Sequence, residues 1–483
     1  MRIIIAGAGR VGTHLAKLLA RERHDITVID ESTEKLSGLG DHYDLLPKTG
    51  SPISITDLRN VDIEHADLFV GVTPNGSVNL MSCMLAKKMG ARKTVARVDT
   101  YEYIKENNQE LFQSIGIDSL IMPEMIAAEE ISSSVPRSWI RQYWDIEGSD
   151  LILLGIKVRG NSTILNQPLR ILCGADAPYH IVAVKRGEET LIPHGNDIVQ
   201  AYDLVYFMTT RKYLGLIRQL TGKEDYPEVR HVTIMGGGLT SQFTARMLPE
   251  SINVKIIEKD EKRCMELADK LPEKRFRIIH GDGRDVALLR DENVQDSQAF
   301  VALTPNSETN ILSCLTAKRM KVRKTVAMLD NVSFVSMAQS LDIGTLINKQ
   351  SIAAAYIYRM LLKADVTNVK SLMVANADVA EFQVQEKSKI TKHLVRDLKL
   401  PEGTNLGGLV RNGQSMLING NTQIEPGDRV VAFCIGNDLY KLSSFFWPHL
   451  YIDKKLTAPF VNKQSKHDKF SHTLPHNWHP TLH

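Results

Sequence analysis

The chain has 483 residues, of which 43% are hydrophobic and 24% charged, so its composition is that of an ordinary soluble protein with two to four domains. A net charge of +3 is too small to favour nucleic acid as a partner, and the five cysteines lack the spacing of a metal or disulfide framework, so we expect no metal site. No apolar run approaches the roughly 20 residues that span a bilayer, so any role at a membrane must come through a partner.

The first predicted elements are a β-branched strand, RIIIA, a glycine-rich turn and a helix. The turn reads Gly7-x-Gly9-x-x-Gly12, and a second strand ends at Asp30. In this context the first glycine permits a tight turn, the second lets the backbone approach a pyrophosphate, and the third allows close helix–strand packing. The helix N-terminus offers free N–H groups to the phosphates. A carboxylate at Asp30 accepts hydrogen bonds from ribose hydroxyls and repels a 2′-phosphate, which favours NAD-like or plain adenine nucleotides over NADP.

Two later turns of this first unit are predicted at the same edge of the sheet. The third strand ends at Gly50-Ser51, where no acidic residue stands. The fourth strand, LFVGVT, has the pattern of a strand buried on both faces and runs into Thr73-Pro74-Asn75. These residues turn the chain over the carboxyl edge, where ligands of doubly wound sheets bind. Asn79 falls on the first turn of the next helix, where it either reaches the ligand or satisfies the backbone.

A second copy of the unit follows later in the chain. The motif TPNxxxN occurs at 73–79 and again at 304–310, beginning there with Thr304, and both copies lead into similar helices. The second glycine turn keeps Gly236 and Gly238 but has Ser241 in place of the third glycine. Glu258 ends the next strand, and Gly281-Asp282 closes the third. The second unit either binds a nucleotide as the first does or is a degenerate structural copy.

Each unit alternates short apolar strands with helix-length segments, which indicates βαβ units and a parallel sheet. A helix-length apolar stretch and a short β-rich module follow each unit, and the two modules also align with each other. We therefore expect an α/β fold, a tandem repeat of Rossmann-type doubly wound parallel sheets, each with a small β-rich C-terminal module. The expected boundaries are 1–120, a crossover helix at 121–145 and a module at 146–222, then 229–345, a crossover helix at 346–368, a module at 369–447 and a disordered, His-rich tail at 448–483.

The order of Rossmann unit, crossover helix and β-rich module, written twice, resembles the tandem RCK (regulator of K⁺ conductance) family. The motifs that carry the resemblance are IIIAGAGRVG with TVID, the doubled TPNxxxN, HGDGRD, LINKQSIAAA, and LPEGTNLGGLVRNG followed by EPGDRVVAF. Nearly the whole chain, to about Trp447, is similar to the peripheral nucleotide-binding subunits of Trk-type potassium uptake systems.

The resemblance implies a cytoplasmic, ligand-gated regulatory subunit and not an enzyme. It implies NAD(H) as the ligand, with ATP or ADP as alternatives. It also implies a homo-oligomeric ring, as a tetramer of tandem chains, on the inner face of the cell membrane beneath an integral-membrane potassium-translocating subunit (TrkH/TrkG-like). Together with the motifs above, it gives as candidate binding residues Gly7, Ala8, Gly9, Arg10, Val11, Gly12, Asp30, Gly50, Ser51, Thr73, Pro74, Asn75 and Arg97 in the first half, and Gly236, Gly238, Glu258, Gly281, Asp282 and Thr304 in the second.

Two positions depart from the family pattern. Asp99 stands where the family commonly has a second arginine, and Met328 occupies the position equivalent to Arg97. Both changes remove positive charge and weigh against recognition of a third phosphate, especially in the second half. We therefore expect the first half to be the tighter, NAD(H)-type site.

Two other functions share parts of this pattern. An NAD-dependent oxidoreductase needs a proton-transfer group beside the nicotinamide. His14 lies on the first helix, where a surface or packing role is expected, and neither His180 nor His194 has a suitable acidic partner in the sequence. The β-rich modules are also small for a substrate domain. An RCK-type sensor of a different ion transporter differs only in its partner and stays open.

Overall fold

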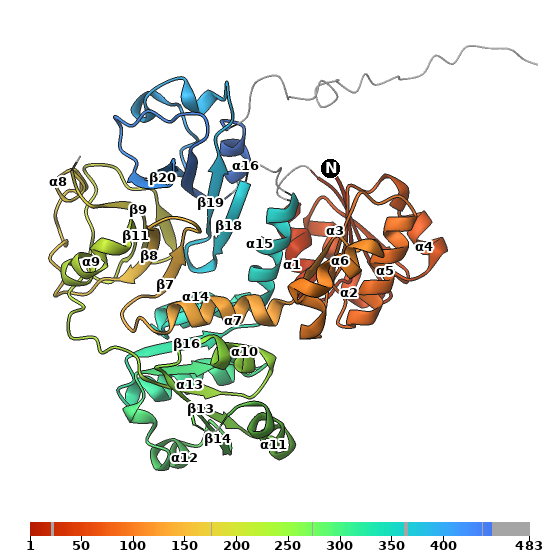
Figure 1. The fold of residues 1–483 in the computed structure, drawn as a ribbon, viewed down its shortest axis with the longest axis horizontal. Coiled ribbons are helices and arrows are strands. Elements are labelled where there is room, and N and C mark those ends of the chain that lie inside the picture. The colour runs from red at the N-terminus through yellow and green to blue at the C-terminus, as the bar shows by residue number, and fades with distance from the viewer. Residues whose placement is uncertain (21–23, 175, 273, 362–365, 437, 447–483) are drawn as a thin grey trace, which may run out of the picture.

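The computed structural model describes residues 1–20, 24–174, 176–272, 274–361, 366–436 and 438–446 (Figure 1). The tail expected to be disordered, 448–483, lies outside these residues. The described chain forms two six-stranded parallel sheets and two five-stranded antiparallel sheets, which confirms the expected fold class. Within the described ranges, no helix is long and apolar enough to cross a membrane, and no group of three or more His, Cys, Asp or Glu side chains is arranged to hold a metal ion.

The first Rossmann unit has the strand order β3-β2-β1-β4-β5-β6, with every pairing parallel. Its central strand is the isoleucine run of the N-terminus, and Ile3, Ile4 and Ile5 are fully buried because helices cover both faces of the sheet. The elements are β1 (Arg2–Ala6), α1 (Arg10–Leu19), β2 (Asp25–Asp30), α2 (Thr33–Leu36), α3 (Leu39–His42), β3 (Leu46–Thr49), α4 (Ile55–Asn60), β4 (Leu68–Gly71), α5 (Gly76–Lys88), β5 (Lys93–Arg97), α6 (Glu106–Ser114) and β6 (Ser119–Ile121).

The second Rossmann unit repeats this topology with the order β14-β13-β12-β15-β16-β17. In both units the order reverses between the first strand and the fourth, which places the crevice for a ligand at the carboxyl ends of those strands. The elements are β12 (His231–Met235), α10 (Leu239–Met247), β13 (Asn253–Glu258), α11 (Glu261–Lys270), β14 (Phe276–His280), α12 (Val286–Asp291), β15 (Ala299–Ala302), α13 (Ser307–Arg319), β16 (Lys324–Met328), α14 (Val335–Ser340) and β17 (Thr345–Ile347).

Two crossover helices, α7 (Pro123–Ser134) and α15 (Lys349–Leu361), are exchanged between the two halves (Figure 1). Helix α7 follows the first unit but packs on α10 of the second, and α15 follows the second unit but packs on α1 of the first. The helix expected over 121–145 is shorter in the structure. It ends at Ser134, with Val135 as the C-cap, because Pro136 has no backbone N–H with which to continue the helical hydrogen bonds.

The two β-rich modules are antiparallel sheets that pack on each other through one shared core, in which the rings of Tyr206 and Phe433 lie 5.5 Å apart. The first module comprises β7 (Gln142–Asp145), β8 (Leu151–Lys157), α8 (Leu169–Leu172), β9 (Tyr179–Arg186), β10 (Glu189–Leu191), β11 (Leu204–Thr210) and α9 (Leu214–Leu220). The second comprises β18 (Val366–Leu372), β19 (Ala377–Gln383), β20 (Thr404–Arg411), β21 (Gln414–Leu417), β22 (Arg429–Ile435) and α16 (Asp438–Ser443).

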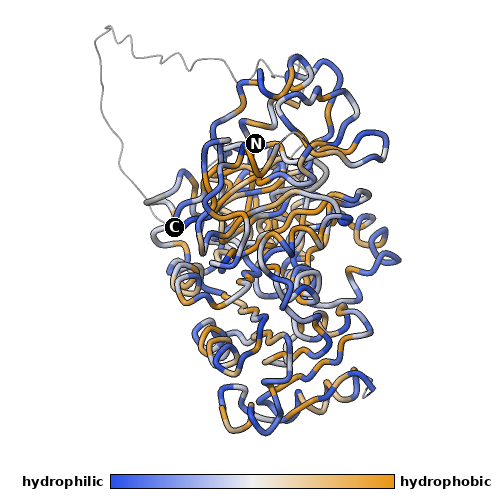
Figure 2. Tube along the Cα trace, turned by 90° about the vertical axis from the view of Figure 1, so that its left-hand side faces the viewer, coloured by the Kyte–Doolittle hydropathy of each residue, from blue (hydrophilic) through white to orange (hydrophobic). Residues whose placement is uncertain are grey.

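The remaining helical segments are short 3₁₀ turns between these elements. They are η1 (Ile63–His65), η2 (Tyr101–Ile104), η3 (Arg211–Tyr213), η4 (Val294–Asp296), η5 (Val332–Phe334), η6 (Met373–Ala375), η7 (Lys389–Thr391) and η8 (Val395–Asp397). Figure 2 shows the hydrophobic residues gathered in the strands at the centre of the molecule and the hydrophilic residues mostly on the outer helices and loops.

Candidate functional site

The glycine turn after β1 has the geometry of a phosphate-binding turn. Gly7 has φ of +115°, and a Cβ there would lie 2.9 Å from the backbone nitrogen of Thr73. A Cβ on Gly12 would overlap the carbonyl oxygen of Gly7, so this glycine sets how closely α1 approaches β1. Gly9 faces open space, with no atom within 4 Å of an added Cβ. The first and third glycines therefore shape the turn, and the second leaves room for a ligand to approach the backbone.

The N-terminus of α1 supplies the positive end of this site. Gly9 is the N-cap of the helix and has no side chain to satisfy the first N–H groups. The first turn carries no acidic residue, and the N–H groups of Arg10, Val11 and Gly12 precede the first helical hydrogen bond, which Thr13 donates to Gly9. These three donors and the helix dipole favour an anion at this point.

Asp30 holds the turn against the end of β2. One carboxylate oxygen accepts a hydrogen bond of 2.7 Å from the N–H of Ala8, and the other accepts one of 2.9 Å from the N–H of Ser32. The side chain is 11% exposed, with Lys35 as a weak ion-pair partner at 3.8 Å. A carboxylate has about four lone-pair sites, so Asp30 keeps the capacity to accept ribose hydroxyls while it fixes the turn.

The Thr73-Pro74-Asn75 turn is held by Asn79, whose role the sequence left open. Asn79 is 1% exposed, and its side-chain oxygen accepts hydrogen bonds from the N–H and the hydroxyl of Thr73, both at 2.8 Å. Its amide group donates to the carbonyl oxygens of Thr73 and Arg97. Asn79 is therefore a structural residue that ties α5 to the ends of β4 and β5. Asn75 caps α5 by accepting from the N–H groups of Ser77 and Val78, and Pro74 and Asn75 are exposed at the sheet edge.

At the end of β3, a carboxylate comes from a residue that the sequence analysis did not single out. The N–H of Gly50 donates to the carbonyl oxygen of Asp30 at 3.1 Å, and the N–H of Ser51 donates to the Asp57 carboxylate at 2.9 Å. Asp57 lies in the first turn of α4, and its own N–H donates to the hydroxyl of Ser54, the N-cap. The Ser54-x-x-Asp57 spacing is a capping-box pattern, which is the signal that could have indicated this residue.

The two arginines of the candidate site have acidic partners in other elements. Arg10 is 67% exposed and pairs at 3.0 Å with Asp330, which follows β16 of the second unit and is 12% exposed. Arg97 pairs at 3.4 Å with Glu124 in the first turn of α7, and Glu124 also lies 3.5 Å from Lys349 at the start of α15. Phosphate binding by Arg10 and Arg97 stays a prediction, and both arginines link the first unit to the crossover helices or to the second unit.

The second unit reproduces most of this geometry. Gly236 has φ of +99°, and an added Cβ on Gly238 would meet no atom within 4 Å. Glu258, 7% exposed, accepts hydrogen bonds from the N–H groups of Gly237 and Asp260, as Asp30 does in the first unit. Ser241 is fully buried, and its hydroxyl has no hydrogen-bond partner among the described residues, a cost that the glycine of the first unit avoids.

The remaining candidates of the second unit have partners within the unit. Thr304 and Asn310 make the same contacts as Thr73 and Asn79, including a hydrogen bond of 2.7 Å between the two side chains. Asp282 forms a two-pronged ion pair with Arg284, which lowers the pKa of its carboxyl to about 2. A Cβ on Gly281 would lie 2.5 Å from a terminal methyl group of Leu288, so a larger residue there would displace this side chain of α12.

Of the histidines considered as catalytic residues, His180 belongs to the interface between the two β-rich modules. His180 lies on β9, and its Nδ1 is 3.0 Å from the carbonyl oxygen of Ile418 in the second module. Burial lowers the pKa of His180, so its ring is neutral at physiological pH. His194 is exposed, with the Asp197 carboxylate 3.7 Å from its Nδ1.

Comparison with known proteins gives consistent matches along the chain. The TrkA-N domain model matches residues 3–123 and again 232–349, and the TrkA-C domain model matches 379–446. The Trk system potassium uptake protein TrkA of Halomonas elongata is 30% identical over 441 residues, which cover 90% of this chain and 96% of that protein. The protein of the same name from Vibrio alginolyticus is 29% identical over 462 residues, which cover 92% and 100%.

Solved structures with the same fold include the GsuK channel, with a TM-score of 0.58 at 14% identity over 92% of this chain and 78% of that one. The GsuK RCK domain gives a TM-score of 0.57 at 15% identity over 92% and 94% of the two chains. The GsuK channel bound to NAD gives a TM-score of 0.57 at 14% identity, over 92% of this chain and 78% of that one.

Proposed function

The chain belongs to the TrkA family of potassium uptake proteins, a family of regulatory subunits and not of enzymes, and on this premise we propose that nucleotide binding in its Rossmann units controls potassium uptake by a membrane-embedded partner. The observation that carries the proposal is the exchange of the crossover helices. Each glycine turn opens a helix, α1 or α10, and that helix packs on the crossover helix of the other half.

The exchanged helices give a physical route from ligand to shape. A dinucleotide at the N-terminus of α1 would contact the helix that packs on α15. In the sequence, α15 is followed by the second module. The same relation joins α10, α7 and the first module. A ligand that binds one arrangement of these helices better than another shifts the population between them, and a coupling of about 1–3 kcal/mol changes apparent affinities roughly 5–150-fold.

We propose NAD(H) as the ligand of the first unit, with ADP or ATP as competitors. The complete glycine turn, the uncapped N-terminus of α1 and the acidic residue Asp30 support this choice, and Asp30 disfavours NADP by repelling a 2′-phosphate. The GsuK channel, which shares the fold, has been solved bound to NAD. The second unit is the weaker site in this proposal because Ser241 replaces its third glycine and Met328 replaces the arginine of β5.

The partner in this proposal is an integral-membrane potassium-translocating subunit of the TrkH/TrkG kind. The chain would act in the cytoplasm, at the inner face of the membrane, as a homo-oligomeric ring. Closed symmetry is the common arrangement of soluble homo-oligomers.

The experiment is a calorimetric titration of the full-length protein with NADH, NAD⁺, ADP and ATP. Asp30→Asn and Glu258→Gln remove the charge of the two equivalent acids with little change of shape, and each variant is the control for the other site. We expect Asp30→Asn to weaken NADH binding at least tenfold, while Glu258→Gln leaves that binding event unchanged. Loss of NADH binding only in Glu258→Gln would reverse the assignment of the two sites, and steady oxidation of NADH would contradict a regulatory function.

A second measurement tests control of transport. The protein is added to vesicles that contain the potassium-translocating subunit, and rubidium uptake is followed with and without NADH. Uptake that depends on nucleotide in the wild type but not in Asp30→Asn would support the proposal. Rubidium uptake that is the same with and without the protein and the nucleotide would contradict it.

A further inference from the structure

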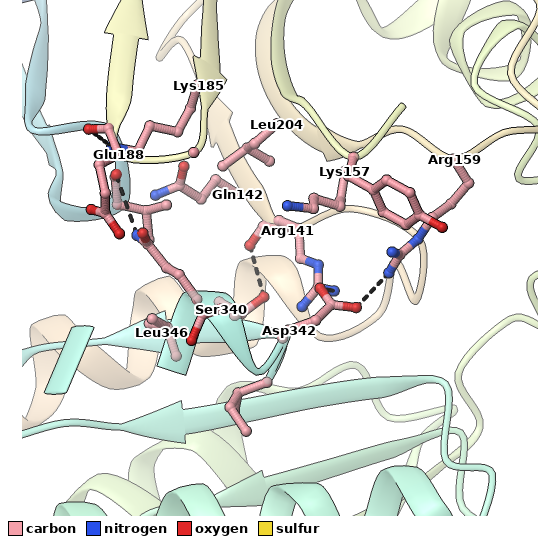
Figure 3. Close-up of a pocket in the computed structure, with 17 residues that line it drawn as sticks. Arg141, Gln142, Lys157, Arg159, Lys185, Glu188, Leu204, Ser340, Asp342 and Leu346 are labelled. Atoms are coloured by element: carbon pink, nitrogen blue, oxygen red, sulfur yellow. Dashed lines mark hydrogen bonds and ion pairs between the residues drawn. The ribbon is translucent and has the colours of Figure 1, made fainter. Parts of the chain in front are cut away.

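Two adjoining cavities lie between the first module and the second Rossmann unit, away from both glycine turns. Their volumes are about 430 and 520 Å³, and both are lined by Arg141, Lys157 and Arg159. Figure 3 shows the smaller one, in which Arg141 and Arg159 point toward Asp342 and Lys157 lies beside them. We call the larger one the basic cavity. Its walls come from the segment before β7, the end of β8, the segment after α9, and the α13–β16 corner.

The basic cavity carries a large excess of positive charge. The described residues that line it include no aspartate or glutamate, and its cationic lining residues are Arg141, Lys157, Arg159, Lys223, Lys318, Lys321, Arg323 and Lys324. Asp342, from the neighbouring cavity, is shared by three of them. Its carboxylate lies 2.9 Å from Arg141, 2.5 Å from Arg159 and 3.2 Å from Lys318.

The other five cations have no carboxylate partner among the described residues. Lys223 is only 3% exposed, and its ammonium group lies 3.4 Å from the Tyr226 hydroxyl and 4.7 Å from the centre of the Tyr226 ring. Burial, with the charges of Arg159 and Arg141, lowers the pKa of Lys223 to about 8 although Asp342 acts in the opposite direction. Lys324 is 2% exposed and donates to the Ile140 carbonyl and the Thr345 hydroxyl. Of the five, Lys223 and Lys324 are buried, and burial lowers the pKa of both because an unpaired charge is costly there. An anion in the cavity would offset that cost.

The first Rossmann unit contains the same corner and serves as an internal comparison. There, Arg92 pairs with Asp67 at 3.4 Å, and Lys87 pairs with Asp118 at 2.8 Å. In the second unit, the residue equivalent to Asp67 is Gln298, so Arg323 lacks the carboxylate that Arg92 has.

A further cation has been added at this corner in the second unit. Gly90 of the first unit has φ of +120°, and its equivalent, Lys321, keeps a positive φ of +70° although it is not a glycine. The second copy therefore has a glutamine in place of the acid and a strained lysine in place of the glycine, at a corner that the first module covers.

We propose that the basic cavity binds a small anion that carries two or three phosphate groups. The volume is within the range of small-molecule sites, and the unpaired cations can offset the charge of such an anion. A cavity of this volume between two parts of the chain fits a compact anion, whereas nucleic acid or a membrane surface requires an extended basic face. The anion would join Arg141, Lys157 and Lys223 of the first module to Lys321 and Arg323 of the second unit, and would hold these two parts together.

The test is calorimetric titration of the full-length protein with inorganic tripolyphosphate at low ionic strength. The variant is Lys321→Gln with Arg323→Gln, because both side chains are exposed and neither supports the core. The matched control is Arg92→Gln, the equivalent change in the first unit. We expect the double variant to lose at least about tenfold in affinity for one binding event, whereas Arg92→Gln binds as the wild type does.

Three further readouts make the result specific. At pH 8, binding should take up protons because the anion raises the pKa of Lys223, so the measured enthalpy will depend on the buffer. The melting temperature without anion should not fall in the double variant, since a purely structural role would lower it. ATP titrated against the same variants distinguishes the source: tighter binding than tripolyphosphate at this site indicates a nucleotide, and equal or weaker binding indicates an inorganic anion.

The proposal is overturned if the wild type does not bind tripolyphosphate, or if the double variant binds it as tightly as the wild type. It is also overturned if Arg92→Gln weakens binding by the same factor. None of these outcomes depends on the nucleotide sites, because the variants leave both glycine turns unchanged.

Discussion

Asp342 provides the sharpest test of the electrostatics at the joint between the first module and the second unit. Burial alone would raise the pKa of its carboxyl, but Arg141, Arg159 and Lys318 lower it from 3.8 to about 2. A difference of almost two pKa units corresponds to roughly 2–3 kcal/mol of folding free energy. Asp342→Asn also leaves three cations without their shared partner, so we expect the free energy of unfolding to fall by about 2–4 kcal/mol at pH 7.

The pH dependence of this loss has a definite sign. The pKa of Asp342 is lower in the folded protein than in the unfolded chain, so its stabilisation is complete above about pH 4 and disappears as the pH falls toward 2. The difference between wild type and Asp342→Asn should therefore shrink across this window. Urea unfolding followed by tryptophan fluorescence measures it, since Trp139 lines the basic cavity and is 8% exposed.

The control for this experiment is Asp282→Asn. Its carboxyl has a pKa lowered to about 2 as well, but its side chain is 34% exposed and that of its partner Arg284 is 59% exposed, so solvent screens the pair. We expect Asp282→Asn to cost no more than about 1 kcal/mol. Equal losses for the two variants, or a loss at Asp342 that does not change between pH 7 and pH 3, would refute the reasoning.

Three further predictions concern single residues. Gly7→Ala should destabilise the protein by about 2–4 kcal/mol because Gly7 has a positive φ and lies close to the Thr73 backbone. Gly9→Ala should unfold as the wild type does but bind NADH at least tenfold more weakly. Thermal melts measure the stability of both variants, and calorimetry measures their NADH binding. Asn79→Ala should cost about 2–4 kcal/mol in urea unfolding because it removes a buried amide that donates to two partly buried carbonyl groups and accepts from Thr73. Lys223→Met should raise the melting temperature at pH 7, because folding lowers the pKa of Lys223 from 10.5 to about 8 and so destabilises the wild type while this lysine is charged. The wild type regains this stability as the pH rises from about 8 to 10.5. A higher melting temperature of the variant that persists at pH 10.5 would contradict this cause.

The sequence was sufficient for the parts of the fold that depend on local patterns. The repeat, the glycine turns and the acids at Asp30 and Glu258 all lie where they were expected, and family membership confirmed the resemblance. The expected crossover segment at 121–145 contains α7, which ends at Ser134, two residues before Pro136. The role of Asn79 could not be chosen in advance because one of its partners, the carbonyl oxygen of Arg97, belongs to the neighbouring strand.

The rest of the site depends on contacts between distant segments. No local pattern indicates that Arg10 meets Asp330, or that Glu124 meets Lys349, because each of these contacts joins distant segments from the two halves of the chain. The basic cavity also depends on contacts between distant segments. Its cations come from four separate segments, each of which is an ordinary charged surface when considered alone.

The positions of these contacts relate the proposed ligands to one another. Glu124 begins α7 and Lys349 begins α15, so the ion pairs of Glu124 join the starts of both crossover helices to β5 of the first unit. A nucleotide that attracts Arg10 or Arg97 competes with Asp330 or Glu124, and thereby weakens a contact between the halves while it forms its own. Glu124 has a buried oxygen without a hydrogen-bond partner among the described residues, so this junction is already incompletely satisfied and its rearrangement costs less than that of a fully bonded one. An anion in the basic cavity acts on a different joint, between the first module and the second unit, and strengthens it. The two ligands therefore act on separate contacts of one chain, and their effects on the arrangement of the halves need not have the same sign.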